Sequence, residues 1–173
     1  MNKFASNILS VGCWNIEGIY EKINGVTVSK LEDETFQNTL EKFDILCLQE
    51  THASKNDRPK FNNFVTIPPH CREISGNKRY FGGMLLFIRS TIRKGVKVNN
   101  KIDVDILEIV LDKKFFGFTK DIRILFTYAS PITSPYTRSR ENTVLEKIET
   151  YIEDGRNSFL VMGDLNGKTR TDM

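Results

Sequence analysis

The chain has 173 residues, of which 39% are hydrophobic and 27% are charged, and its formal net charge is +3. This composition is ordinary for a soluble globular protein, and the length leaves little room for two domains of usual size. The small positive charge neither indicates nor excludes a nucleic-acid partner. No apolar run approaches the roughly 20 residues of a membrane helix, and the first residues lack the apolar stretch of a signal peptide. We therefore expect one domain and no membrane contact.

The first third of the chain predicts two buried strands separated by a helix. The run Ile8–Ile16 is mostly apolar and predicts a strand. Ser29 followed three residues later by Glu32 resembles a capping box, which predicts a helix start. Asp44–Glu50 predicts a second short buried strand. The apolar residues of the predicted helix are Leu31, Phe36, Leu40 and Phe43.

The middle of the chain is dense in predicted strands. Residues 51–63 are polar and predict a loop, and Pro68–Pro69 predicts the end of a strand that begins at Phe64. Residues 75–78 carry a turn signal. The connection from Asp112 to Asp121 predicts a hairpin with a long loop. The strands predicted here are Gly83–Ile88, Val104–Leu111 and Ile122–Tyr128.

The last part of the chain predicts a loop, a helix and a strand. Ser130–Arg138 contains two prolines and predicts the loop, and Gly155 stands where a helix-ending glycine belongs. Ser158–Met162 predicts a final buried strand that runs directly into Asp164. The apolar face of the predicted helix consists of Val144, Leu145, Ile148, Tyr151 and Ile152. We therefore predict a single mixed α/β domain.

Three cysteines are present, in positions 13, 47 and 71, with no CxxC pair and no metal-finger spacing. Cys13 and Cys47 stand inside apolar runs, where free cysteine usually behaves as a small buried hydrophobe. We therefore expect unpaired thiols and a reducing, intracellular compartment.

Polar side chains follow the predicted strands at the points where the strands end. Asn15 follows the first, Gln49–Glu50 the second, and Asp164 and Asn166 the last, while a fourth strand ends in Tyr128. A carboxylate at the end of an apolar strand is costly to desolvate unless it gains a partner, and a cation is an effective partner. Oxygen ligands favour Mg²⁺ or Mn²⁺ over zinc. Each residue alone could cap a turn, but together they indicate a metal site.

Four segments in order resemble the successive motifs of the endonuclease/exonuclease/phosphatase superfamily. They are Trp14–Gly18, Asp44–Thr51, Tyr128–Pro131 and Met162–Asn166. Gly82–Gly83, leading into the next strand, also resembles the central glycine-to-strand step of the family. The resemblance implies an α/β fold, a two-sheet sandwich with outer helices of the DNase I type.

The same resemblance implies a role for each strand-end residue. Glu50 is similar to the metal-binding glutamate of the family, and Asn15 to the asparagine that supports the metal-binding carboxylate. Tyr128 is similar to the tyrosine that contacts the scissile phosphate. Asp164 is similar to the aspartate that positions or activates the attacking water, and Asn166 to the asparagine that steadies the phosphate or the transition state. The implied cofactor is Mg²⁺, with Mn²⁺ as a substitute.

One departure from the family pattern concerns its last motif. Family members continue into further strands, another aspartate and a Ser-Asp-His-like triplet, and no such pattern follows Asn166. His52 and His70 do not occupy that position, although His52 could lie at the rim of the site or in an exposed loop. We therefore expect residues 1–173 to be one domain truncated at its C-terminal end. The expected consequences are missing strands, an exposed edge beside Ser158–Met162 and an incomplete site.

Tyr128–Pro131 together with Ser134–Tyr136 is most similar to the endonuclease domains of non-LTR, LINE-like retrotransposons, which nick DNA to prime a reverse transcriptase. The implied partners are the DNA phosphate backbone and a C-terminal reverse transcriptase, for a monomer that would act in the nucleus. Basic residues in predicted loops could contact phosphates, and Tyr80 or Phe81 could stack on a base. The candidate DNA-contacting residues are Lys78, Arg79, Arg138 and Arg140, with Lys55, Arg58 and Lys60 as a further cluster.

Three alternatives remain open on the sequence alone. An abasic-site repair endonuclease, or a phosphatase or lipase acting on inositol phosphates or sphingomyelin, would share the strand-end residues. A protein of another class, either a decayed relic or a module that binds nucleic acid without cutting it, would share the fold but lack activity.

Overall fold

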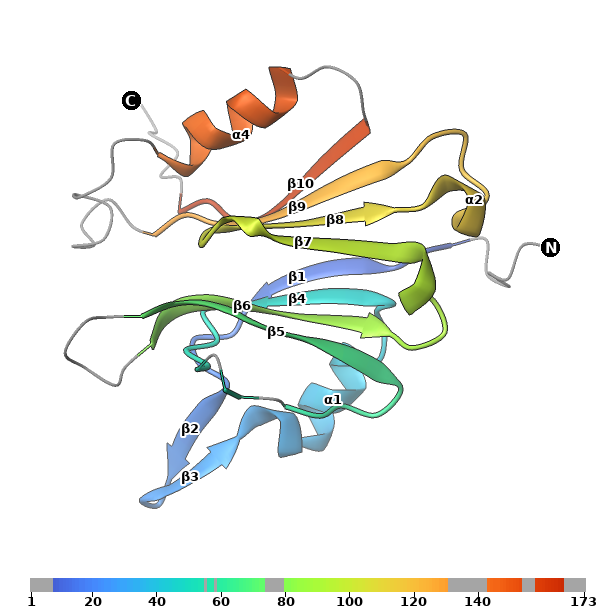
Figure 1. Cartoon of the computed structure of the whole chain (residues 1–173). Coiled ribbons are helices and arrows are strands. Elements are labelled where there is room, and N and C mark those ends of the chain that lie inside the picture. Colours follow the sequence, from blue (N-terminus) through green and yellow to red (C-terminus); the bar gives the residue numbers. More distant parts are fainter. Residues whose placement is uncertain are drawn as a thin grey trace, which may run out of the picture.

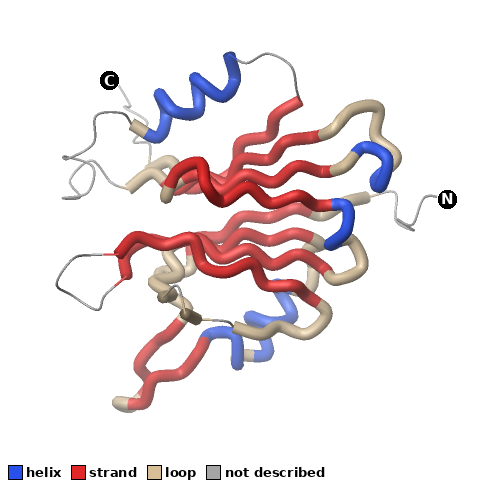
Figure 2. Tube along the Cα trace, viewed as in Figure 1, coloured by secondary structure: helices blue, strands red, loops and turns tan. Residues whose placement is uncertain are grey.

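The computed structural model describes residues 8–54, 56–57, 59–73, 80–130, 143–153 and 158–166. Within these residues two four-stranded sheets lie face to face, and helices cover their outer faces (Figures 1 and 2). The predicted two-sheet α/β sandwich is therefore confirmed.

The first sheet has the order β1-β4-β6-β5. Its strands are β1 (Val11–Asn15), β4 (Ile45–Gln49), β6 (Tyr80–Arg89) and β5 (Phe64–Glu73). β1 and β4 are parallel, with Asn15 opposite Gln49, whereas β6 is antiparallel to both of its neighbours. Because carboxyl ends of parallel strands meet at one edge, Asn15 and Glu50 emerge at the same end of this sheet.

The second sheet has the order β10-β9-β8-β7. Its strands are β10 (Ser158–Asp164), β9 (Ile122–Tyr128), β8 (Ile106–Leu111) and β7 (Val96–Asp103). β10 and β9 are parallel, with Asp164 opposite Tyr128, so these two residues also emerge at one end. β10 is the last strand of this sheet in the described part of the chain, and Leu160 on it is 45% exposed. The exposed edge that was expected beside Ser158–Met162 is therefore present among the described residues.

Helices and a hairpin cover the two outer faces. α4 (Val144–Glu153) lies over the second sheet, where Val144 and Ile148 pack on Ile106 and Leu125 (Figure 1). Beneath the first sheet lie α1 (Glu34–Leu40) and the hairpin of β2 (Tyr20–Ile23) and β3 (Val26–Ser29). The shorter elements are η1 (Lys30–Glu32), η2 (Arg93–Gly95) and α2 (Lys113–Phe116). None of the helices in the described ranges has the length and hydropathy needed to cross a membrane.

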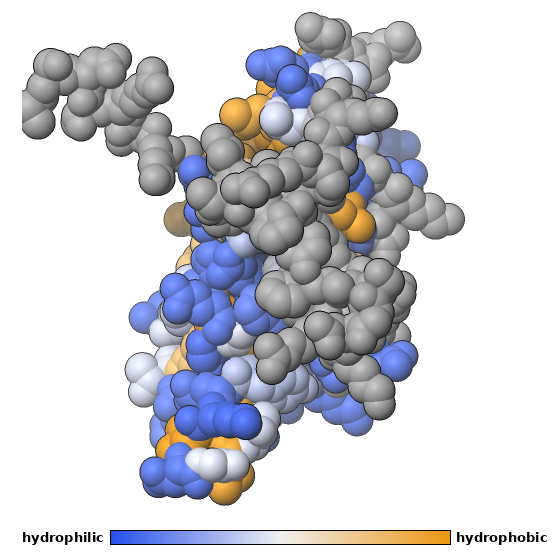
Figure 3. Space-filling model, turned by 90° about the vertical axis from the view of Figure 1, so that its left-hand side faces the viewer, coloured by the Kyte–Doolittle hydropathy of each residue, from blue (hydrophilic) through white to orange (hydrophobic). Residues whose placement is uncertain are grey.

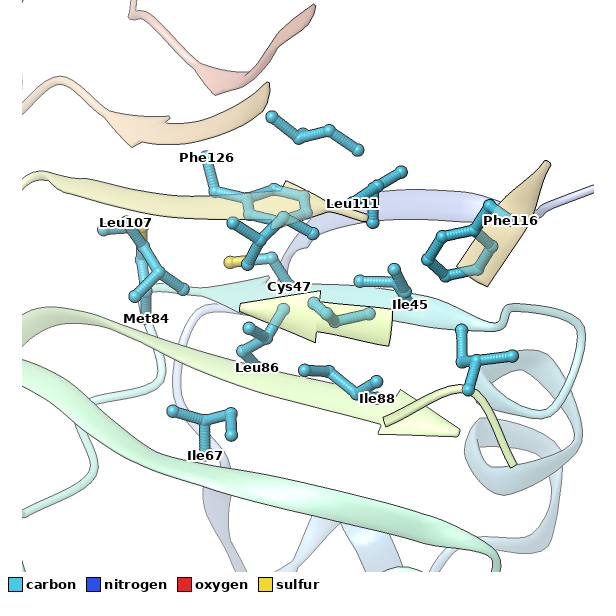
Figure 4. Packing of buried hydrophobic residues seen from close by; sticks show 14 of the residues in the cluster. Ile45, Cys47, Ile67, Met84, Leu86, Ile88, Leu107, Leu111, Phe116 and Phe126 are labelled. Carbon is cyan, nitrogen blue, oxygen red and sulfur yellow. The ribbon is translucent and has the colours of Figure 1, made fainter. Parts of the chain in front are cut away.

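The main hydrophobic core lies between the two sheets (Figure 4). Its most buried members come from the central strands of each sheet, where side chains of both inner faces interdigitate. A second cluster lies between the first sheet and α1. Residues labelled in the figure include Ile45, Cys47, Met84, Leu86 and Ile88 from the first sheet and Leu107, Leu111 and Phe126 from the second.

The predicted burial is confirmed for Cys47, whereas Cys13 is only partly buried. None of the three cysteines forms a disulfide within the described residues; Cys47 and Cys71 are buried, and Cys13 packs against the main core. Burial raises the pKa of the Cys47 thiol well above its ordinary value, and the neighbouring Cys13 thiol adds to this rise. Cys47 therefore behaves as an apolar core residue.

Two sequence predictions about element boundaries were wrong. Ser29 does not cap the long helix, because it accepts the Leu31 N–H at 3.2 Å and starts the single turn η1. Asp33 is the true cap of α1 and accepts the Phe36 N–H at 2.7 Å. Pro68–Pro69 does not end a strand either, because β5 runs through both prolines with a register shift after Ile67. β5 is an edge strand, and such strands tolerate prolines that donate no ladder bond.

Two strand pairs were missed or misplaced. The hairpin β2–β3 was missed; it turns at Asn24–Gly25, where both residues have positive φ. The Asn-Gly pair is the strongest short-range hairpin signal in a sequence. β7 was missed because three consecutive polar residues, 99–101, interrupt its alternating pattern. The strand predicted from Val104 begins instead at Ile106. β1 is shorter than predicted, and Trp14, 38% exposed, stacks on Phe36 outside the main core. The predicted glycine helix end at 155 lies outside the described residues.

Candidate active site

The carboxyl ends of β1, β4, β9 and β10 lie at one end of the sandwich, on the left in Figure 1. This end brings together all five residues that the sequence analysis selected as catalytic. They are Asn15, Glu50, Tyr128, Asp164 and Asn166. The parallel pairing within each sheet aligns the strand ends, and the facing of the two sheets brings the pairs to one place.

The first pair in the site is Glu50 with Tyr128. The Tyr128 hydroxyl donates a hydrogen bond to Oε1 of Glu50. Glu50 directly follows β4 and has a left-handed backbone, with φ of 50°. Gly82 has φ of 62°, and a Cβ there would lie 3.2 Å from Cε1 of Tyr128. The glycine thus lets β6 pass close to the tyrosine ring, which explains the predicted glycine-to-strand step.

The second pair is Asn15 with Asp164. Nδ2 of Asn15 donates to Oδ2 of Asp164 at 2.9 Å, and Oδ1 of Asn15 accepts the Glu17 N–H at 3.1 Å. These two bonds define the orientation of the Asn15 amide. The carboxylate that Asn15 orients in this structure is therefore that of Asp164.

Asn166 completes the arrangement on the loop after β10. Its backbone N–H donates to Oδ1 of Asp164 at 2.9 Å, so both oxygens of that carboxylate accept hydrogen bonds. Nδ2 of Asn166 donates to the Ala129 carbonyl at 2.7 Å, and the Ala129 N–H donates to the Asp164 carbonyl at 2.8 Å. The segment after β9 is thereby tied to the end of β10.

Gln49 was recognised in the sequence as a polar residue at a strand end but was given no role in the site. It is 1% exposed, and its amide bonds to the backbone of both β9 and β10. Its position at the end of an apolar strand was a signal for this role, because a buried polar side chain must find hydrogen-bond partners.

The donor set of the site suits a small oxygen-loving cation. Glu50 and Asp164 come from opposite sheets, and the described residues contain no group of three or more His, Cys, Asp or Glu placed to hold a metal. Mg²⁺ needs only one or two protein carboxylates, because waters and substrate phosphates supply the other ligands. With carboxylate and amide oxygens and without a cluster of His or Cys ligands among the described residues, the site fits Mg²⁺ or Mn²⁺ and does not fit a structural zinc ion.

The two histidines differ in their surroundings. His52 is exposed, has φ of 51°, and its N–H donates to the Gly82 carbonyl at 2.9 Å. It thus lies on the loop that follows Glu50. A ring nitrogen of His70 bonds to the Asp103 carbonyl and links β5 to β7. His70 therefore has a structural partner between the edges of the two sheets.

The predicted substrate-binding residues Lys78, Arg79, Arg138 and Arg140 lie outside the described residues, as do Lys55 and Arg58 of the further cluster. Lys60 is described and exposed. Figure 3 looks onto the left-hand side of Figure 1, where the described residues are mainly hydrophilic. The hydrophobic colour at its lower end agrees with the exposure of Ile23 and Val26 in the β2–β3 hairpin.

Comparison with known proteins identifies the family. Residues 12–171 match the model of the endonuclease/exonuclease/phosphatase family, so the chain belongs to that family. Among solved structures, an AP endonuclease from Archaeoglobus fulgidus is similar, with 20% sequence identity and a TM-score of 0.50. That alignment covers 92% of this chain and 58% of the archaeal chain, so this chain spans little more than half of that relative. No curated protein sequence matches.

Proposed function

We propose that this member of the endonuclease/exonuclease/phosphatase family hydrolyses phosphodiester bonds in DNA with Mg²⁺, for which Mn²⁺ can substitute. The observation that carries the proposal is the convergence of two side-chain pairs, Glu50 with Tyr128 and Asn15 with Asp164. Each pair takes one member from each sheet. A metal carboxylate, a water-positioning carboxylate and neutral donors are the parts that phosphodiester hydrolysis requires.

Asp164 is the group that we propose to position the attacking water. Asn15 and the Asn166 N–H hold its two oxygens, so the plane of the carboxylate has one orientation. A fixed carboxylate can accept the proton of a water that attacks in line with the leaving oxygen. Asn15 and Asn166 therefore act on the reaction through Asp164, because the Asn15 side-chain amide and the Asn166 backbone N–H hold its carboxylate.

Glu50 is the group that we propose to hold the ion. When bound, Mg²⁺ would neutralise charge on the non-bridging phosphate oxygens. Tyr128 already donates its hydroxyl to Glu50, so the same hydroxyl lies within reach of a phosphate oxygen held beside that carboxylate. Tyr128 would then stabilise the charge that develops on phosphorus-bound oxygen.

We further propose a retroelement-type endonuclease that nicks DNA. Support comes from the Tyr128–Pro131 motif with Ser134–Tyr136, and from the basic residues Lys78, Arg79, Arg138 and Arg140 in the sequence. In that setting the chain would act as a monomer in the nucleus, next to a reverse transcriptase in the same polypeptide. Non-specific attraction to the phosphate backbone would make binding salt-dependent.

The test is nicking of supercoiled plasmid by purified protein with Mg²⁺, with Mn²⁺ and with chelator. Asp164→Ala should reduce Mg²⁺-dependent nicking by at least about 100-fold, since it removes the group that positions the water. The matched control is Glu149→Ala, which removes an exposed carboxylate on α4, an element that supplies none of the five site residues. Nicking that survives in Asp164→Ala at the wild-type rate would overturn the proposal.

Substrate choice separates the remaining functions. The retroelement hypothesis predicts cleavage of undamaged plasmid, whereas an abasic-site repair enzyme would cut only plasmid that carries abasic sites. Release of inorganic phosphate from inositol phosphates, with intact DNA untouched, would point to a phosphatase. DNA binding that needs no divalent ion and leads to no cleavage would point to an inactive binding module.

A further inference from the structure

Gln49 is a polar side chain inside an apolar strand, and it is almost completely buried, with 1% of its surface exposed. A buried amide must satisfy its donors and its acceptor within the protein. Nε2 of Gln49 donates to the Thr127 carbonyl at 2.6 Å, and Oε1 accepts the Asp164 N–H at 2.9 Å. Both partners belong to the second sheet, whereas Gln49 belongs to the first.

The two partners are backbone groups beside catalytic side chains. Thr127 directly precedes Tyr128, and the accepted N–H belongs to Asp164 itself. Gln49 also precedes Glu50 and stands opposite Asn15 in the β1–β4 ladder. The buried amide therefore bonds the backbone of Asp164 and of the residue before Tyr128, and it lies on the strand pair that carries Asn15 and Glu50.

Gly163 shows how closely the strands approach at this point. Its φ is 150°, and a Cβ there would lie 1.8 Å from the Thr127 carbonyl oxygen and 2.9 Å from Nε2 of Gln49. Any larger residue would push β10 away from β9 and from the Gln49 amide. The backbone that carries Asp164 is therefore held against the same carbonyl that Gln49 binds.

We propose that Gln49 is a positioning residue that sets the separation of the two sheets at the active site, and with it the distance between the Glu50–Tyr128 and Asn15–Asp164 pairs. The inference rests on the proposed hydrolysis of phosphodiesters. Gln49 does not touch the substrate; it acts through the backbone of Asp164 and Thr127.

The Gln49 amide contributes to stability as well as to position. An apolar side chain in its place would leave the Thr127 carbonyl and the Asp164 N–H without these bonds, so its removal should also lower the free energy of unfolding. Cys47 and Ile45, on the same strand, meet the second sheet through apolar contacts. Directional bonds differ from such contacts because they fix position as well as proximity, and a displacement of about 1 Å can cost about 100-fold in rate.

The experiment compares two substitutions in the purified protein. Gln49→Met keeps the side-chain volume and removes both hydrogen bonds, while Gln49→Glu keeps an acceptor for the Asp164 N–H and removes the amide donor to Thr127. The matched control is Ile45→Ala, which creates a cavity at the other end of β4. Plasmid nicking gives kcat and KM, and hydrogen exchange gives the protection of the Asp164 amide.

Gln49→Met should lower kcat by about 10- to 100-fold, with KM within about twofold of wild type, and should expose the Asp164 amide to exchange. Gln49→Glu should keep that amide protected and retain more activity than Gln49→Met. Ile45→Ala should lower the melting temperature without lowering kcat at a temperature where it is folded. Loss of kcat in Gln49→Met that merely follows its unfolded fraction, or kcat within twofold of wild type, would overturn the positioning role.

Failure of the proposed function would give a different result. Nicking that is insensitive to Asp164→Ala would reject the catalytic assignment for the site. The hydrogen-exchange comparison between Gln49→Met and Gln49→Glu uses no activity, so it still decides whether Gln49 holds the Asp164 backbone. An Asp164 amide that is equally protected in wild type and in Gln49→Met would reject the link itself.

Discussion

The two ends of the sandwich are built from the same strands but are held together in different ways. At the end away from the site, Ile45, Ile88, Leu111 and Phe116 close the space between the sheets by apolar packing (Figure 4). At the site end the sheets meet through directional bonds of Gln49, Asn15 and Tyr128. Apolar packing tolerates small shifts of the partners, whereas a reaction at a phosphate does not.

The two ends also differ in how many residues have a left-handed backbone. Among the described residues, six other than glycine have positive φ, and four of them, Glu17, Glu50, His52 and Asn166, flank the strand ends of the site. Asn63 precedes β5 at the other end, and Asn24 lies in the β2–β3 turn. A left-handed backbone in a residue other than glycine costs roughly 1–3 kcal/mol when the surroundings impose it. The site end therefore contains most of these costly backbone conformations, and the apolar packing of the sandwich must supply the free energy that maintains them.

The largest effect is expected at the apolar end. Leu111→Ala removes a side chain that is 2% exposed in the main core. It should lower the free energy of unfolding by about 2–5 kcal/mol, since it removes apolar contact and leaves a cavity. Urea denaturation measures this loss. Nicking per folded molecule should not change, and a specific loss of kcat would show that the two ends are not independent.

A smaller effect is expected from Glu50→Gln at the site end. The substitution keeps the shape and an acceptor for the Tyr128 hydroxyl, but it removes the charge that we propose for the ion. Mn²⁺ affinity, measured by electron paramagnetic resonance, should fall by at least about tenfold. The free energy of unfolding should stay within about 1 kcal/mol of wild type. Unchanged Mn²⁺ affinity would show that Glu50 is not the ligand.

Tyr128→Phe should act on rate more than on folding. It removes the hydroxyl that bonds Glu50 and leaves the ring, which packs in the core. We expect a 10- to 100-fold lower kcat, roughly 1.4–2.7 kcal/mol, because one donor to the developing charge is lost. The folding cost should be about 1 kcal/mol. Equal kcat values for the two proteins, compared at saturating plasmid, would remove Tyr128 from the chemistry.

The smallest effect concerns the thiol in the middle of the core. Burial raises the pKa of Cys47, so the unfolded chain ionises this thiol at a lower pH than the folded protein does. Its contribution to stability is therefore complete below the unfolded pKa and is lost as the pH rises through the folded one. At pH 8, Cys47 should react with a thiol reagent only after unfolding. Mass spectrometry of the labelled native protein should find Cys47 unmodified, and rapid native labelling would contradict its burial.

The sequence was enough to predict the fold class, and the five residues that it selected for the site lie at one end of the sandwich. Apolar runs with polar ends are local patterns, and the motifs around Asn15, Glu50 and Asp164 are contiguous in the chain. The helix start at Asp33 and the continuation of β5 through its prolines were not predicted. Both depend on neighbours, because a cap competes with an adjacent cap and a proline is tolerated only where its strand has a free side or a bulge.

What only the tertiary structure decided is which side chain meets which. The motifs do not say that Asn15 bonds Asp164, that Tyr128 bonds Glu50, or that Gln49 joins the sheets, since each contact spans between 78 and 149 residues of sequence. Sheet order and register place these groups together, and they arise from the packing of two inner faces as a whole. The amino-acid sequence by itself determined the chemistry available to the site, and the facing of two sheets determined its geometry.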